Sequence, residues 1–137
     1  MMLTLKERQK RPDKKKALSI LSAARRDMEF TLGIKPDKGS ASTIIRNIYE
    51  CFRMLGEALL VSRGIEPRDH VLPIRELMKL PVSTSRPVSL IETLRKLRHG
   101  VNYYGYSPSM LEVGDALSIA ESCFEPLYRA VYAEVKK

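Results

Sequence analysis

Apolar residues recur along this chain at intervals of three and four, the spacing that gathers side chains on one face of an α-helix. The longest such run lies between the loop at Gly39 and the helix stop at Gly64. Its stripe is formed by Ile44, Ile48, Cys51, Leu55 and Leu59 and is widened by Ile45, Tyr49, Phe52 and Leu60. We expect a long amphipathic helix here, with Ser40 or Ser42 capping its first turn through the hydroxyl oxygen.

Helical periodicity also appears on both sides of this segment, and no run alternates with the period of two that is typical of a strand. The final segment begins with Ser109-Met-Leu-Glu112, a capping-box pattern, and contains Pro126, which should kink or divide the helix. The other predicted helices cover about residues 13–32, 68–80 and 87–102. The pattern predicts an all-α fold, an antiparallel up-and-down bundle of four to five helices.

Length and charge divide the chain into two parts. Residues 1–12 read as a basic, flexible tail, and residues 13–137 as a single helical domain large enough to bury a core. Residues 1–16 carry a net charge of +5 out of a total of +8, so the remainder is nearly balanced. The total charge is therefore weak support for nucleic-acid binding.

Several classes of protein do not fit the sequence. It has no apolar run of the roughly 20 residues that span a bilayer, and its first residues lack the apolar core of a secretory signal. We expect a cytoplasmic protein without a membrane partner. Phosphate-loop, dinucleotide-binding and HExxH motifs are missing, so we expect no metal and no cofactor. Cys51 and Cys123 lie among apolar residues, which predicts buried, reduced thiols.

The candidate chemistry is concentrated in residues 94–106, which read LRKLRHGVNYYGY. On a helix Arg95, Arg98 and Asn102 share one face, and their guanidinium groups suit bidentate phosphate binding. His99 and Tyr103 are neighbours one turn apart, and we expect Tyr106 to continue their row. The predicted nucleotide- or RNA-binding residues are Arg95, Arg98, His99, Asn102, Tyr103 and Tyr104. The alternative is a structural helix end, whose cations complement the helix dipole and whose tyrosines close the bundle.

The order of these motifs resembles the HEPN family (higher eukaryotes and prokaryotes nucleotide-binding) over about residues 13–135. Residues 48–64, IYECFRMLGEALLVSRG, are similar to the long second helix of that family, and IEPRDH at 65–70 to the following linker. Leu94-Arg-Lys-Leu-Arg98 with its tyrosines resembles the late-helix signature, and ALSIAE at 116–121 the last helix. The resemblance implies a helical bundle that dimerises with this signature facing the dimer axis.

Many HEPN proteins are metal-independent ribonucleases that use an arginine and a histidine four to six residues later. Arg98 matches the arginine, but Tyr103 stands where the histidine is expected. His99 is adjacent to Arg98, so on a helix the two side chains diverge by about 100°. Tyrosine, with a pKa of about 10, is a poor base near neutrality. The catalytic candidates are therefore Arg98, Tyr103 and His99, and whether the chain is an enzyme stays open.

A polar residue of the second helix often faces this site in the family, and Glu50 and Glu57 are the two candidates. Both belong to a ladder of alternating charge with Arg46 and Arg53, which favours a solvated helix face. Gly100 and Gly105 could bend the chain so that Arg98 meets Tyr103; otherwise the two would have to meet across a dimer.

Three functions follow from the residues and the resemblance. The leading one is a homodimer that binds RNA or a nucleotide with weak or degenerate catalysis. It would pair with a nucleotidyltransferase-like protein in a toxin–antitoxin system. The rival is an active, metal-independent ribonuclease toxin with a displaced base. The third is a non-enzymatic helical interaction module.

Overall fold

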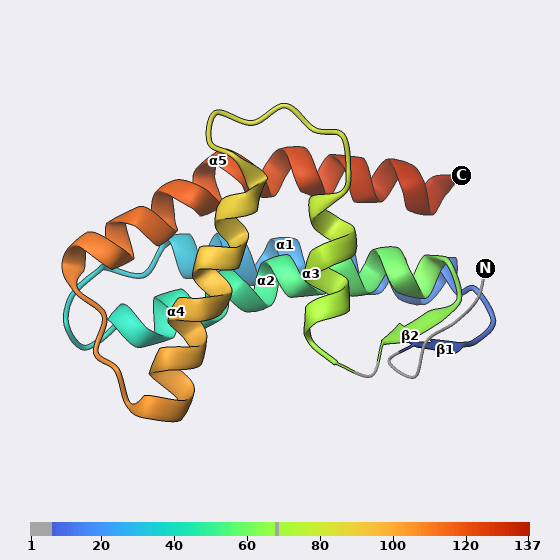
Figure 1. The fold of residues 1–137 in the computed structure, drawn as a ribbon. Helices are drawn as coiled ribbons and strands as arrows, with labels where there is room; N and C mark the ends of the chain where they lie inside the picture. Colours follow the sequence, from blue (N-terminus) through green and yellow to red (C-terminus); the bar gives the residue numbers. More distant parts are fainter. Residues whose placement is uncertain (1–6, 68) are drawn as a thin grey trace.

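The fold is all-α, as the apolar periodicity predicts. A computed structural model describes residues 7–67 and 69–137 of the chain, and within them five α-helices account for most residues (Figure 1). The elements in order are β1 (Glu7–Gln9), α1 (Lys14–Leu32), α2 (Ala41–Ser62), β2 (Ile65–Pro67), α3 (Val71–Met78), a 3₁₀ turn (Val88–Leu90), α4 (Ile91–Tyr104) and α5 (Met110–Lys136).

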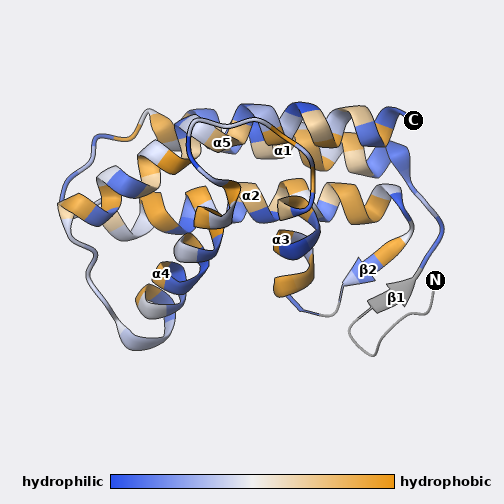
Figure 2. Cartoon of the chain, turned by 45° about the horizontal axis from the view of Figure 1, so that its top comes forward, coloured by the Kyte–Doolittle hydropathy of each residue, from blue (hydrophilic) through white to orange (hydrophobic). Residues whose placement is uncertain are grey.

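Helix α2 lies at the centre of the molecule. Helices α1 and α5 run alongside it, antiparallel to each other, while α3 and α4 lie across it (Figures 1 and 2). Twelve of the 22 residues of α2 are buried, including the whole predicted apolar stripe. Such a wide apolar surface is expected for a helix that is covered on several sides by other helices.

The helix starts show which capping predictions were correct. Asp13 caps α1 by accepting a hydrogen bond from the Lys16 amide at 2.9 Å. At α5 the predicted capping box forms, since Ser109 and Glu112 each accept from the other's backbone amide. The side-chain hydrogen bond predicted to cap α2 does not form. Ser40 occupies the N-cap position, but its hydroxyl donates to the Lys35 carbonyl at 2.7 Å and so orders the preceding loop instead.

The start of α3 and the end of α4 differ from the predicted boundaries, each for a local reason. Helix α3 starts at Val71, because the Asp69 carboxylate accepts from the first amides of that turn; position 68 lies outside the described residues. Helix α4 continues to Tyr104 and ends where Gly105 adopts a φ of 62°. Helix α5 stays continuous through Pro126 and bends in its course, the first of the two outcomes predicted for this proline (Figure 1).

A short two-stranded ladder was not predicted. Strand β1 pairs antiparallel with β2, and three residues on each side are too few to show a period in the sequence. Beyond the ladder the Lys10 amide donates to the Gly64 carbonyl at 2.6 Å. Gly64 has a φ of 76°, and a Cβ there would stand 2.3 Å from the Lys10 carbonyl oxygen. Residues 7–10 of the predicted tail are therefore hydrogen-bonded to the domain, and residues 1–6 lie outside the described part.

Cys51 and Cys123 are buried free thiols, as predicted. Burial raises the pKa of Cys51 to about 12, which keeps it protonated and unreactive. None of the helices in the described residues combines the length and apolar character needed to cross a bilayer.

Candidate functional site

The crossing of α4 over α2 brings the predicted arginine cluster onto a buried tyrosine. The guanidinium carbon of Arg98 lies 5.2 Å from the centroid of the Tyr49 ring, within cation–π distance. Arg98 is half-buried in this position. It forms no ion pair with a carboxylate of residues 7–67 or 69–137, so its charge is available to an anion.

Tyr49 was expected only as part of the apolar stripe, but its hydroxyl is the unusual group of this site. The side chain is fully buried, and its hydroxyl has no hydrogen-bond partner among the described residues. Burial raises the pKa of Tyr49, while the positive charges of Arg98, Arg95 and Arg53 act in the opposite direction. Burying a hydroxyl without a hydrogen-bond partner costs about 1–3 kcal/mol of folding stability. The Tyr49 hydroxyl is thus a buried polar group close to the charges of three arginines.

Arg53 is the second residue whose role the sequence pattern misjudged. The ladder on α2 was expected to be solvated, yet the Arg53 side chain is only 18% exposed. Its Nε donates to both oxygens of Glu50, at 2.9 and 3.1 Å, and its Nη1 donates to Glu57 at 3.0 Å. The hydrogen bond that Arg53 donates to Glu50 is the largest cause that raises the pKa of Arg53, so this arginine stays charged near Tyr49.

The two acidic candidates of α2 differ in what they face. Both hold Arg53, but only the charge of Glu50 acts noticeably on the Tyr49 hydroxyl, whose pKa it raises. Glu57 instead lines a hollow with Lys10, Lys16 and the strand β2. Of the two, Glu50 is therefore the residue whose charge acts on the Tyr49 hydroxyl.

Arg95 lies on the same face of α4 as Arg98 but has a local partner. Its Nε and Nη2 donate to Glu92 Oε1 at 2.8 and 2.6 Å. This pairing raises the pKa of Arg95 and lowers that of Glu92. An anion at Arg95 would have to compete with a carboxylate, whereas an anion at Arg98 would not.

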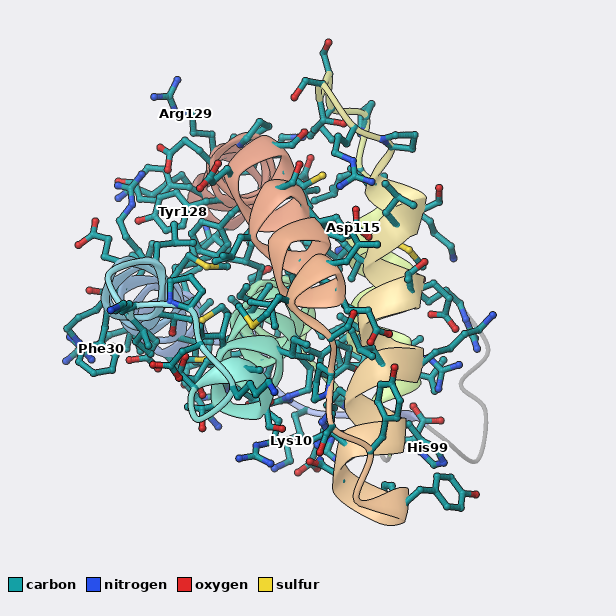
Figure 3. All side chains as sticks on the ribbon, turned by 90° about the vertical axis from the view of Figure 1, so that its left-hand side faces the viewer. Lys10, Phe30, His99, Asp115, Tyr128 and Arg129 are labelled. Atoms are coloured by element: carbon teal, nitrogen blue, oxygen red, sulfur yellow. The ribbon has the colours of Figure 1, made fainter. Side chains whose placement is uncertain are left out.

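The aromatic residues of α4 gather on its outer side. His99 contacts Tyr103 with ring centroids 4.6 Å apart, as the one-turn spacing predicted, and its ring also lies 5.7 Å from that of Tyr104. Tyr103 and Tyr104 are 68% and 77% exposed. We call His99, Tyr103 and Tyr104 the aromatic corner; Figure 3 shows its histidine on the far side of α4 from the core. Such exposed rings can stack on bases.

Tyr106 does not continue this row, contrary to prediction. Its amide donates to the Gly100 carbonyl at 3.2 Å, and its hydroxyl donates to Glu112 Oε1 at the start of α5. The reason is the left-handed turn at Gly105, which sends the chain back along α4.

The three catalytic candidates do not meet within one chain. Helix α4 is uninterrupted from Ile91 to Tyr104, so Gly100 does not supply the bend that would bring Arg98 and Tyr103 together. Arg98 points to Tyr49 on α2, while His99 and Tyr103 belong to the exposed aromatic corner. Asn102 is exposed in the last turn of the helix.

No three His, Cys, Asp or Glu side chains within the described ranges lie close enough to share a metal ion. Comparison of the chain with protein-family models, with curated proteins and with solved structures gives no match. The geometry offers an anion two half-buried guanidinium groups, Arg95 and Arg98, and places exposed aromatic rings on the outer side of the same helix.

Proposed function

We propose that this protein binds RNA or a nucleotide at the α2–α4 face, as a HEPN-like protein of weak or degenerate catalytic activity. The observation that carries the proposal is the position of Arg98 over the buried Tyr49, whose hydroxyl has no hydrogen-bond partner among the described residues. No carboxylate of those residues neutralises Arg98.

Phosphate is the anion that this arrangement suits best. A guanidinium fork donates two parallel hydrogen bonds to phosphate oxygens, and the partial burial of Arg98 reduces the screening of its charge by water. Arg95 on the same helix face can add a second contact if its bond to Glu92 is exchanged. The aromatic corner, on the outer side of the same helix, offers a stacking surface to a base further along a bound strand.

We expect weak RNA cleavage because the two candidate general bases, His99 and Tyr103, do not meet Arg98 within one chain. Ribonucleolytic cleavage needs a group that removes the proton of the ribose 2′-hydroxyl close to the arginine that stabilises the charged transition state. His99 and Arg98 diverge on an unbroken helix, and a tyrosine at position 103 has too high a pKa for this role near neutrality.

The resemblance to HEPN domains also supports two proposals about assembly. The first is a homodimer in which the aromatic corner and Arg98 of two subunits approach the two-fold axis. The large exposed area of Tyr103 and Tyr104 is compatible with such a contact. The second is a nucleotidyltransferase-like protein as partner, as in toxin–antitoxin pairs.

The test is binding of a labelled RNA of about 12 nucleotides, followed by fluorescence anisotropy, to the full chain and three variants. Charge-assisted hydrogen bonds contribute about 1.5–3 kcal/mol, so Arg98→Ala should weaken binding by at least about ten-fold. Arg98→Lys should recover only part of this loss, because an ammonium group lacks the fork. Arg75→Ala, which removes an exposed arginine of α3, is the matched control.

The change caused by Arg75→Ala should be small and should vanish as salt is raised. If Arg98→Ala binds RNA as tightly as Arg75→Ala at both low and high salt, the α2–α4 face is not the binding site.

A further inference from the structure

A second cluster of cations and aromatic rings lies between α1 and α5. The guanidinium carbon of Arg25 on α1 stands 4.0 Å from the centroid of the Tyr128 ring on α5, and the same group forms an ion pair with Glu125. Together with Arg129 and Tyr132 these residues line an open groove of about 520 Å³.

The aromatic part of this groove is a row along α5 at one-turn spacing. The rings of Tyr128 and Tyr132 are inclined by only 20°, with centroids 6.4 Å apart. The row continues with Lys136, whose Nζ lies 5.7 Å from the Tyr132 centroid. Tyr132 is 42% exposed, so part of its ring is open to a ligand.

The charge of the groove is positive. Arg129 has a side chain that is 78% exposed and shares Glu125 with Arg25. Two lysines lie beyond the groove, where α1 begins and α5 ends. There the Lys14 Nζ donates a hydrogen bond to the Lys137 carbonyl. Two cations, Arg25 and Arg129, line the groove against one carboxylate, Glu125, and Lys136 lies beside Tyr132.

We propose that this α1–α5 groove binds single-stranded nucleic acid, with a base stacked on Tyr132 and the backbone phosphates contacting Arg129 and Lys136. Rings and cations that alternate along a groove are the features that bind single strands without sequence preference. A duplex fits poorly, because its bases are already stacked and cannot reach the tyrosine. An acidic peptide would use the cations but would leave the exposed ring without a partner.

This groove is separate from the α2–α4 face. Figure 3 shows Tyr128 and Arg129 on one side of the bundle, near α1 and α5, and His99 on the other side. The proposal therefore stands or falls independently of the function proposed above. If both hold, one strand could contact the protein at two faces.

The experiment compares binding of labelled oligoadenylate RNA and DNA, each about 12 nucleotides long, in the wild-type background and in Arg98→Ala. Tyr132→Ala should weaken binding on the order of ten-fold in both backgrounds, as expected for the loss of one stacked base. Tyr132→Phe, which keeps the ring, should recover most of that affinity. Arg129→Ala should lower the salt dependence by up to about one phosphate contact. Lys38→Ala, in the exposed loop before α2, is the charge control.

Ultraviolet crosslinking followed by peptide mapping provides the second measurement, and thermal unfolding checks that each variant is folded. Crosslinks at Tyr132 or Tyr128 that persist in Arg98→Ala would support the groove, and equal yields with RNA and DNA would show that the 2′-hydroxyl is not read. Unchanged affinity of Tyr132→Ala in both backgrounds would overturn the proposal. A dissociation of dimers by Tyr132→Ala without loss of nucleic-acid binding would overturn it too, because the groove would then be an interface between two copies.

Discussion

At the scale of single residues, the sharpest constraint is the absence of a side chain at Gly56. A Cβ at this position of α2 would stand 2.1 Å from the carbonyl oxygen of Pro73 in α3. Backbone atoms cannot yield as the end of a flexible side chain can. Only glycine lets α3 approach α2 so closely.

We predict that Gly56→Ala destabilises the protein by about 1–3 kcal/mol, the usual cost of overpacking a core. Gly114→Ala is the matched control. Gly114 is an exposed residue within α5, and a Cβ there would have no atom within 4 Å. That variant should gain about 0.5–1 kcal/mol from helix propensity. Urea unfolding measures both. Equal stability of the two variants would contradict the close crossing of α2 and α3.

At the scale of an element, the start of α5 depends on one carboxylate. Glu112 accepts from the Ser109 amide at 2.9 Å and from the Tyr106 hydroxyl. Both bonds lower the pKa of Glu112, and the bond from the Ser109 amide has the larger effect. The charged form is therefore favoured by folding, and its contribution is present above the unfolded pKa of about 4.3 and lost as the pH falls through the lower folded value.

We predict that Ser109→Ala costs about 1 kcal/mol of stability, as other N-cap replacements do.

Glu112→Gln keeps an acceptor at the same position but cannot titrate. The gap in unfolding free energy between wild type and Glu112→Gln should thus be larger at pH 6 than at pH 3, measured by urea unfolding at both values. A gap that is the same at both pH values would show that the carboxylate charge adds nothing to this cap.

At the scale of the whole molecule, α4 decides whether a catalytic site can form in one chain. Its unbroken course holds Arg98 against α2 and Tyr103 on the outer surface. A meeting of these two residues requires a second subunit.

We predict a homodimer by light scattering, with twice the 15.6 kDa of the chain. In such a dimer Tyr103→His should supply a general base in trans and raise RNA cleavage by about 10²–10⁴-fold, with 2′,3′-cyclic phosphate ends.

Mixing distinguishes a shared site from one within a chain. The double variant Arg98→Ala, Tyr103→His should be inactive alone and should regain cleavage when exchanged with wild-type subunits. Exchange with Arg98→Ala subunits is the control and should restore nothing. A species of 15.6 kDa alone, or an active Tyr103→His variant without rescue by mixing, would contradict a site shared between subunits.

Much of the fold could be predicted because it depends on local periodicity. The stripe from Ile44 to Leu59 is buried throughout, and the capping box at Ser109 forms as its spacing implies. These features need only neighbouring residues, whose positions on a helix are set by 3.6 residues per turn. The burial of Cys51 follows from the same stripe.

The candidate site could be predicted only in part. The contact of His99 with Tyr103 lies within one helix and was expected, but the place of Arg98 over Tyr49 was not, because α2 and α4 are far apart in the sequence. Arg53 looked like part of a solvated ladder, and nothing local indicates that it is largely covered.

The sequence by itself thus determined which segments are helices, where most of them begin and which residues form their apolar faces. The tertiary structure alone decided that α4 lies across α2, that β1 pairs with β2 and that Arg25 meets Tyr128 between α1 and α5. The physical reason is the range of the interactions. Helix formation and capping act over a few residues, whereas the angle at which helices cross depends on side-chain packing between distant segments.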